Sequence, residues 1–300
     1  MSARAAAIEP LTLEQVELAA EAAGRAPSVH NTQPWRISVR HGDLFLTADP
    51  DRRLPVADPD GREMLISCGA ALYDLVLALR HLGHRPTVRL LPDPDHPRWL
   101  ALVHPDGGPP GPEGDASRYA AIPRRRTHIG GFSADPLPTG LFARLRRAAE
   151  HERADLTAYT AAAEVRALAT VTELAAYVHA RDTAYAAEHA RWSHDSQVAF
   201  TYAEPDAGTV ALLATPSDLR ADWLYAGIAL QRVLLEAAAS GVAAAIHTQP
   251  LEIPHLRAFV GRAFSPGRHP QALLRFGRPA PGPPKVSTRR PVRDYLTVIP

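Results

Sequence analysis

The sequence predicts an α+β fold in which helices pack against β-sheet. Stretches whose apolar residues recur with the helical period alternate along the chain with short stretches that favour strands. Two alternating stretches flank a His41-Gly42-Asp43 turn, which predicts a β-hairpin and therefore antiparallel pairing. The order of elements expected in the first half returns in the second half, although the residues do not repeat. This order agrees with a pseudo-dimer formed within one chain.

The composition is that of a globular chain: 300 residues, 46% hydrophobic and 22% charged. A chain of this length buries roughly three quarters of its extended surface, so it needs neither disulfides nor metal to fold. Its 33 lysines and arginines balance 32 aspartates and glutamates, which leaves no field to attract nucleic acid or an anionic membrane. The single cysteine, Cys68, excludes an intrachain disulfide framework. We find neither a signal-peptide core nor an apolar run near the ~20 residues of a membrane span, and expect a cytoplasmic protein without a nucleic-acid or membrane partner.

The first half opens with the best-marked helix. Thr12 and Gln15 form a capping box, apolar residues line one face, and Gly24 is placed to end the helix. Hairpin strands are expected through residues 37–39 and 44–48, a buried helix over 63–82, and strands around 88–91 and 100–103. Small residues run from Ser67 to Ala71, so another helix or a ligand is expected to approach the backbone of the buried helix closely.

Glycines and prolines over residues 104–114 mark the best candidate for a linker. It divides the chain into an expected N-terminal unit, residues 1–115, and an expected C-terminal unit, residues 116–300. The second unit should contain a helix at 137–151, a strand at 156–159, a helical stretch of one or two pieces at 162–192, a strand at 210–214, a helix from an Asp218 cap to residue 240, and strands at 242–246 and 272–276. The polar segment 193–209 is a candidate lid, and the tail 279–300 is proline-rich and basic.

The polar loop over residues 26–35 is the most informative stretch. Ser28, Asn31 and Gln33 offer donors and acceptors between a helix end and a strand, and Trp35 provides an apolar anchor. A planar heterocycle with an imide edge needs such alternating groups. The alternative is a turn held by side chain to backbone hydrogen bonds, and the residues alone favour this plainer interpretation.

Two basic clusters are candidate phosphate sites. Arg124, Arg125 and Arg126 stand beside the hydroxyl of Thr127, and arginine offers forked donors and a permanent charge. Arg289 and Arg290 form a second cluster near the end of the chain. A solvated basic run and a basic tail are the competing interpretations.

Other chemistries lack a pattern. The histidines show no spacing typical of a metal site, and no G-x-S-x-G, Walker-type or G-x-G-x-x-G sequence occurs. Ser193-His194-Asp195 carries the residue types of a triad, but triads assemble in space, so adjacency in sequence has no weight. Cys68, in a small apolar helix, is interpreted as a packed core thiol.

Taken together, these stretches resemble the nitroreductase superfamily, and the fuller set resembles its Acg-type branch of actinobacterial proteins. The resemblance covers nearly the whole chain in the right order. It is carried by residues 26–35, Leu54-Pro55, Asp58-Pro59-x-Gly61-Arg62-Glu63, residues 66–72, Arg125-Arg126-Thr127, Asp222-Trp223-Leu224, residues 229–232 and Arg289-Arg290-Pro291.

The resemblance implies a nitroreductase-like fold of two fused nitroreductase-like units that form a pseudo-dimer, with FMN as cofactor. It implies that Arg125, Arg126 and Thr127 hold the FMN phosphate and that Arg290, with Arg289 beside it, completes the clamp. It also implies that Ser28, Asn31 and Gln33 reach the flavin from the opposite unit. The segment 244–249 would lie near the flavin N5.

Two departures from the family pattern affect the cofactor. The basic residue usual two places after Thr127 is Ile129 here, so one contact is missing unless another arginine substitutes. The opening of the chain has no Arg-x-Ser counterpart, so the pseudo-symmetric second site should be empty and one FMN per chain is expected.

The resemblance leaves several functions open. The first is an FMN-dependent oxidoreductase that uses NAD(P)H and nitroaromatic or quinone-type acceptors. The alternatives are a catalytically silent FMN storage or sequestering protein with residues 193–209 as its lid, a flavin-dependent dehydrogenase that tailors a small metabolite, and an interaction module with a vestigial site. We name no catalytic side chain, and expect a monomer that resembles a dimer, with further homodimerisation left open.

Overall fold

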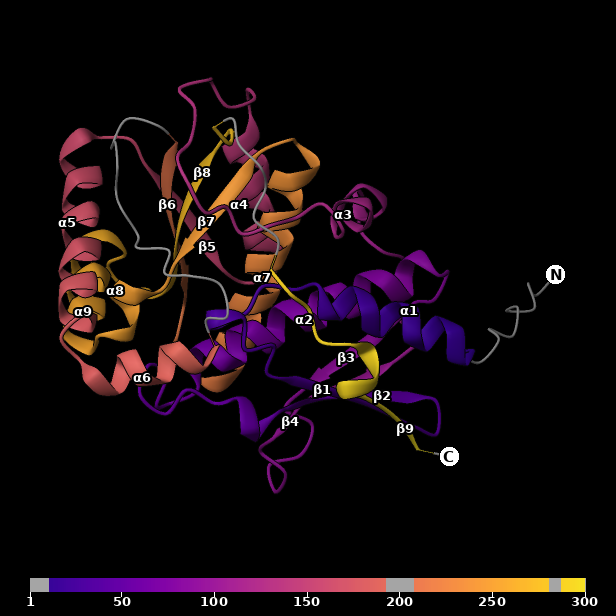
Figure 1. Ribbon diagram of the computed structural model, residues 1–300. Coiled ribbons are helices and arrows are strands. Elements are labelled where there is room, and N and C mark those ends of the chain that lie inside the picture. The colour runs from indigo at the N-terminus through magenta and orange to yellow at the C-terminus, as the bar shows by residue number, and fades with distance from the viewer. Residues whose placement is uncertain (1–10, 193–207, 281–286, 300) are drawn as a thin grey trace.

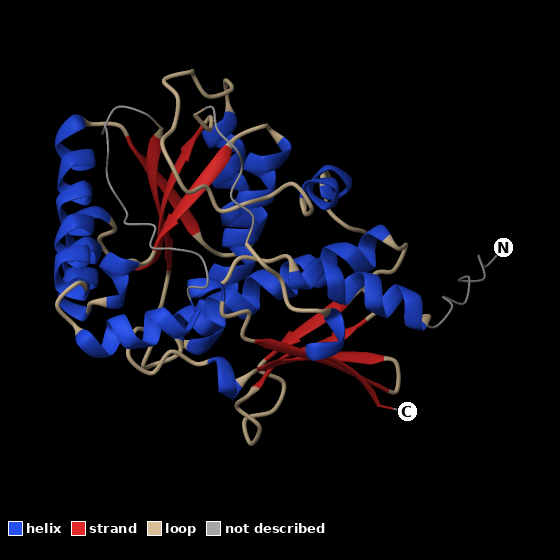
Figure 2. Cartoon of the chain, viewed as in Figure 1, coloured by secondary structure: helices blue, strands red, loops and turns tan. Residues whose placement is uncertain are grey.

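The computed structural model describes residues 11–192, 208–280 and 287–299 (Figure 1). Two β-sheets lie at an angle to each other, with two long helices packed between them (Figure 2). The expected lid, residues 193–209, lies outside the described residues except for its last two positions. The prediction of an α+β fold is confirmed.

The first sheet has five strands in the order β3-β4-β2-β1-β9. The strands are β1 (Trp35–Arg40), β2 (Asp43–Ala48), β3 (Thr87–Leu90), β4 (Trp99–His104) and β9 (Leu296–Ile299). β1 and β2 form the predicted hairpin, with Ile37 opposite Leu46. All neighbours are antiparallel except β1 and β9, which pair in parallel with Ile37 opposite Leu296. The end of the chain therefore completes the sheet that the start of the chain begins.

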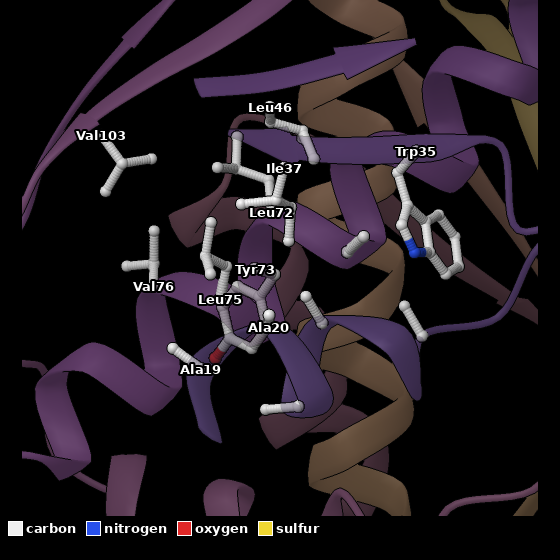
Figure 3. Packing of buried hydrophobic residues seen from close by; sticks show 14 of the residues in the cluster. Ala19, Ala20, Trp35, Ile37, Leu46, Leu72, Tyr73, Leu75, Val76 and Val103 are labelled. Atoms are coloured by element: carbon white, nitrogen blue, oxygen red, sulfur yellow. The ribbon is translucent and has the colours of Figure 1, made fainter. Parts of the chain in front are cut away.

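Helices α1 (Leu13–Gly24) and α2 (Arg62–His81) cover one face of the first sheet. The predicted capping box is present: Thr12 Oγ1 accepts from Gln15 N at 3.2 Å, and Gln15 Oε1 accepts from Thr12 N at 3.0 Å. Figure 3 shows Trp35, Ile37 and Leu46 of the sheet gathered with Leu72 of α2 in this core. All four side chains are buried, so the alternation of the strands matches the apolar face of α2.

The second sheet has four antiparallel strands in the order β5-β6-β8-β7. These are β5 (Asp155–Tyr159), β6 (Thr209–Thr215), β7 (Ala243–His247) and β8 (His269–Gly277). Helices cover both of its faces, so β6 reads as a nearly continuous apolar run. Ala211 and Leu213 pack towards α4 (Leu141–His151) and α7 (Arg220–Ala239). Val210 and Leu212 pack towards α5 (Ala162–His179) and α9 (Pro254–Phe264).

α2 and α7 cross at the centre of the molecule, and each is 20 residues long. Their backbones meet at two glycines: a Cβ on Gly69 would collide with Leu224 O, and a Cβ on Gly227 would collide with Ile66 O. The expected close approach at Ser67–Ala71 is therefore that of a helix. α2 is long and apolar enough by composition to cross a membrane, but 83% of its most apolar stretch is buried inside the protein.

The remaining short elements connect these layers. They are the 3-10 turns η1 (Val29–Asn31), η2 (Pro50–Arg52) and η3 (Val292–Asp294), and the helices α3 (Asp115–Ala121), α6 (Thr183–Trp192) and α8 (Gln249–Glu252).

Three details differ from the sequence expectations. α7 begins after Leu219, whose N–H donates to Asp222 at 3.0 Å, so Asp218 is not its cap. Asp218 instead accepts from Trp223 and pairs with Arg257 at 2.7 Å. α3 and α9 were not predicted, and the basic tail contains strand β9, which lies in the sheet of the first half although the predicted second unit includes it.

Candidate functional site

A pocket of about 260 Å³ lies where the two halves meet. We call it the junction pocket. It is lined by residues of the 27–31 loop, by α2, by α7, and by the segment that follows β7. Its lining includes Ser28, His30, Asn31, Glu63, Ile66, Thr127, Ile129, Leu230, Ile246, Thr248 and Arg289. Residues far apart in the sequence, from Pro27 to Arg289, therefore share one concave surface.

A second pocket of about 790 Å³, the basic pocket, adjoins the first. Arg124, Arg125 and Arg126 line it, together with the end of α7 and the start of β7. Thr127 and Ile129 line both pockets. The two pockets are therefore neighbours that share Thr127 and Ile129: the first has a mixed lining, and three arginines line the second.

The 27–31 loop is held in an unusual conformation by its own side chains. His30, Asn31 and Gln33 all have positive φ angles, of 44°, 56° and 48°. Such backbone costs free energy in non-glycine residues and is concentrated at functional sites. Ser28 Oγ accepts from Gln33 N at 2.9 Å, and Ser67 Oγ accepts from Val29 N at 3.1 Å, which fixes the loop on α2. The loop is therefore the side-chain-stabilised turn that the residues alone favoured, and its residues Ser28 and Asn31 also line the junction pocket.

Arg125 has buried hydrogen-bond donors for which the described residues provide no acceptor. Its side chain is buried, and Nη2 donates to Arg25 O at 2.8 Å. Nε and Nη1 are buried and have no hydrogen-bond partner among the described residues. Burial lowers the pKa of Arg125 to about 10, which still leaves it charged at neutral pH, and Asp74 opposes this shift. Two free N–H groups on a buried cation indicate a site for an anion.

Arg289, near the end of the chain, donates to the same backbone carbonyl as Arg125. Its Nη2 donates to Arg25 O at 3.4 Å, the oxygen that also receives Arg125. Its Nη1 donates to Asn31 Oδ1 at 2.9 Å, and Asn31 Nδ2 donates to Thr288 O at 3.0 Å. Two guanidinium groups therefore meet at one backbone carbonyl beside the junction pocket.

Arg290 and Gln33 bind each other away from the pockets, and the guanidinium of Arg126, which lines the basic pocket, donates to backbone carbonyl oxygens. Arg290 Nη1 donates to the carbonyl oxygens of Gln33, at 2.8 Å, and Trp35, at 3.2 Å, and the Arg290 N–H donates to Gln33 Oε1 at 2.8 Å. Arg126 Nη1 donates to Pro123 O at 2.7 Å and to Arg125 O at 2.8 Å. Arg290 and Gln33 therefore tie the end of the chain to the loop, and Arg289, rather than Arg290, is the arginine at the pocket.

The structure brings together most of the residues singled out from sequence. Ser28, Asn31, Thr127 and Arg289 line the junction pocket, and Arg125, Arg126 and Thr127 line the basic pocket. Sequence reasoning gave no role to Glu63 or His30, although both line the junction pocket, whereas Thr248 belongs to the segment 244–249 that was expected near the flavin. The available signal was that Glu63 is a charged residue in the first turn of a helix predicted to be buried.

Comparison with known proteins identifies relatives along the whole chain. The model of the nitroreductase family matches residues 1–44. "Putative NAD(P)H nitroreductase Rv3131" of Mycobacterium tuberculosis (strain ATCC 25618 / H37Rv) is 35% identical over 296 residues, which cover 88% of this chain and 85% of that protein. "Putative NAD(P)H nitroreductase acg" of the same strain is 31% identical over 324 residues, which cover 96% of this chain and 97% of that protein.

Solved structures give more distant matches. A nitroreductase with bound FMN from Bacteroides fragilis is 14% identical, with a TM-score of 0.42 over 57% of this chain and 92% of the other. A BluB-like flavoprotein from Clostridium difficile is 13% identical, with a TM-score of 0.45 over 60% of this chain and 98% of the other. The full-length similarity to the mycobacterial proteins shows the family, and the chain belongs to the nitroreductase family.

Proposed function

We propose that this protein binds FMN and acts as an oxidoreductase that takes hydride from NAD(P)H and passes it to a nitroaromatic or quinone-type acceptor. The observation that carries the proposal is the buried Arg125, whose Nε and Nη1 have no partner among the described residues and which lines a pocket adjacent to the partly apolar junction pocket. The two mycobacterial relatives carry the names "Putative NAD(P)H nitroreductase Rv3131" and "Putative NAD(P)H nitroreductase acg". These names support the same reaction class.

The basic end of the site fits the FMN phosphate. A phosphate monoester carries nearly two negative charges at neutral pH, as a phosphorylated side chain does. Arg125 and Arg289 supply two positive charges that converge on Arg25 O, and the free Nε and Nη1 of Arg125 can donate to phosphate oxygens. Thr127 adds a hydroxyl at the boundary of the two pockets. Family members usually have a basic residue at the position of Ile129, so this chain has one positive charge fewer there. Arg289 supplies a replacement charge.

The junction pocket fits the flavin ring. Its apolar walls come from Ile66, Ile129, Leu230 and Ile246, and the 27–31 loop supplies polar groups on one side. When bound, FMN supplies the hydride chemistry, and the protein binds and orients it. Asn31, held by Arg289 and by Thr288 O, is positioned to meet the polar edge of the ring.

We further propose that the chain is an internal pseudo-dimer whose two units roughly correspond to residues 1–115 and 116–280. The sheets support this, because the order β3-β4-β2-β1 matches the order β7-β8-β6-β5 with antiparallel neighbours throughout. The central helices support it as well: they are equal in length, and Gly69 and Gly227 make reciprocal contacts. The single flavin would then lie between the units.

The experiment that tests the function is a visible spectrum of the purified protein, followed by NADH or NADPH without oxygen. We expect flavin absorbance that bleaches on addition of the nicotinamide and returns with a quinone or nitroaromatic acceptor. A flavin spectrum that persists would contradict the oxidoreductase and favour sequestration, and a colourless protein that FMN does not restore would contradict the cofactor.

A further inference from the structure

A layer of buried ionisable residues separates the junction pocket from a third pocket. This polar pocket, of about 750 Å³, is lined by Asp58, Arg62, Asp218, Glu252 and Arg257 among others. Glu63 lines the junction pocket, and its neighbour in sequence, Arg62, lines the polar pocket. A short path of charged side chains therefore connects the two cavities through the protein.

Glu63 is buried and only half satisfied. Its Oε1 accepts from Arg62 Nη2 at 2.7 Å. Its Oε2 is buried and makes no hydrogen bond with the described part of the chain. Burial, and then the charge of Glu252, raise the pKa of Glu63 well above its usual value, while Arg62 opposes the shift and Asp58 adds to it. A neutral Glu63 would carry its proton on the oxygen that no other protein group occupies.

Glu252 has the opposite tendency. Burial opposes its ionisation, but the hydrogen bond from His179 and the charges of His30 and His179 lower its pKa. Its oxygens accept from Tyr185 Oη at 3.1 Å and from Thr248 Oγ1 at 2.8 Å, and His179 Nε2 lies 3.3 Å away. The two carboxyl groups thus differ in their environment: the surroundings of Glu252 favour its charged form, and the surroundings of Glu63 favour its neutral form.

We propose that Glu63 donates a proton to the acceptor in the junction pocket and that Glu252 returns a proton to Glu63 from the polar pocket. This inference rests on the proposed function, because a proton is needed only if an acceptor is reduced there. It gives Glu63 a role in the reaction that the binding of FMN alone does not require.

The proton and electron balance of this role is simple. Two-electron reduction of the acceptor adds a hydride, which NAD(P)H provides through the cofactor, and one proton. The O–H bond of Glu63 breaks, the proton moves to the oxygen or nitrogen of the acceptor that has gained negative charge, and Arg62 stabilises the carboxylate that remains. A proton from water in the polar pocket then passes by way of Glu252, which lines that pocket, and neutralises Glu63 again.

The first test locates the proton without any reaction. The infrared spectrum of the protein at neutral pH should contain the band of a protonated carboxyl group. Glu63→Gln, whose amide imitates a neutral acid beside Arg62, should lose that band. Glu188→Gln is the matched control, because Glu188 is buried nearby but accepts from Val56 N and Ala57 N and does not line the junction pocket. Asp74 is a second buried carboxyl group, and burial raises its pKa to about 8, so both proteins are compared in an Asp74→Asn background. A carboxyl band that survives Glu63→Gln in that background overturns the proposal.

The second test separates the two half-reactions. Bound flavin is reduced with one equivalent of dithionite, and its reoxidation by a quinone is followed by stopped flow. In Glu63→Gln this step should slow by about 10²–10⁴-fold at neutral pH and become faster as the pH falls, because solvent must supply the proton. The rate of reduction by NAD(P)H is measured beside it and should fall much less than the rate of reoxidation, because hydride transfer to the flavin does not use the Glu63 proton. An unchanged reoxidation rate overturns the proposal.

The outcomes also distinguish this inference from the proposed function. If NAD(P)H fails to reduce the flavin, the proposed function fails, while the dithionite experiment still measures the step that Glu63 serves. If FMN does not bind, Glu63 is not a proton donor to this reaction, and the infrared band still shows whether it holds the proton.

Discussion

At the scale of single residues, the neighbouring arginines Arg125 and Arg126 have different environments. Arg125 is buried with two free donors, whereas the Arg126 guanidinium donates to nearby backbone carbonyl oxygens. The run Arg124-Arg125-Arg126 does not reveal this difference, since only the direction of each side chain decides it. Burying a cation without an anion is costly, so the site of Arg125 is built for a ligand.

The first prediction concerns that ligand. Arg125→Ala should weaken FMN binding by about 1.5–3 kcal/mol, the contribution of a charged hydrogen bond, which is roughly a ten- to hundredfold higher Kd. Titration of the apoprotein with FMN, followed by flavin fluorescence, measures it. Arg126→Ala is the control and should change the Kd much less. Equal losses in the two variants would show that the phosphate lies elsewhere in the basic pocket.

At the scale of elements, the α2–α7 crossing determines the position of the pocket walls. α2 carries Glu63 and Ile66, and α7 carries Leu230, so the distance between the helices sets the width of the junction pocket. The backbones touch at Gly69 and Gly227, where no side chain fits.

The second prediction follows from this contact. Gly69→Ala and Gly227→Ala should each lower the free energy of unfolding by about 1–3 kcal/mol or more, because the added methyl group overpacks against backbone. Urea unfolding of the apoprotein measures the change. Gly131→Ala is the control, since its Cβ would meet nothing within 4 Å. Unaltered stability in both crossing variants would mean that the helices separate without cost.

Elements with strong local signals were predictable from sequence. The capping box of Thr12 and Gln15, the hairpin and the buried helix α2 all depend on residues close in sequence, and the structure confirms them. Asp218 was misassigned because a tertiary partner, Arg257, binds its carboxylate. The positions of Arg289 and Arg290 were not predictable either, because contacts with the loop some 250 residues earlier determine which of them faces the pocket.

At the scale of the whole molecule, β9 closes the site from a distance. Ile37 N donates to Tyr295 O at 2.7 Å, Tyr295 Oη donates to Ala20 O at 3.1 Å, and β9 continues alongside β1. These contacts anchor the end of the chain beside β1, and Ser287 and Arg289, a few residues earlier, line the junction pocket. We therefore expect binding at the pocket to depend on pairing at the sheet edge.

The third prediction tests this dependence. A chain that ends after Asp294 lacks Tyr295 and β9 and should bind FMN at least tenfold more weakly, because Arg289 is no longer held in place. Removal of residues 299 and 300 alone is the control, since three of the four paired positions remain. Both chains are compared by FMN titration and thermal unfolding. Unweakened binding in the shorter chain would show that Asn31 alone positions Arg289.

The parallel pair β1–β9 also has a consequence during translation. About 260 residues separate Ile37 from Leu296, and at about 5–20 residues per second the ribosome needs roughly 10–50 s to make them. Throughout that interval the outer edge of β1 is unpaired in the nascent chain, and exposed edges invite pairing with other chains. Arg289 is made with the strand that covers this edge. The nascent protein therefore acquires its protection against aggregation and its complete cofactor site in the same final step.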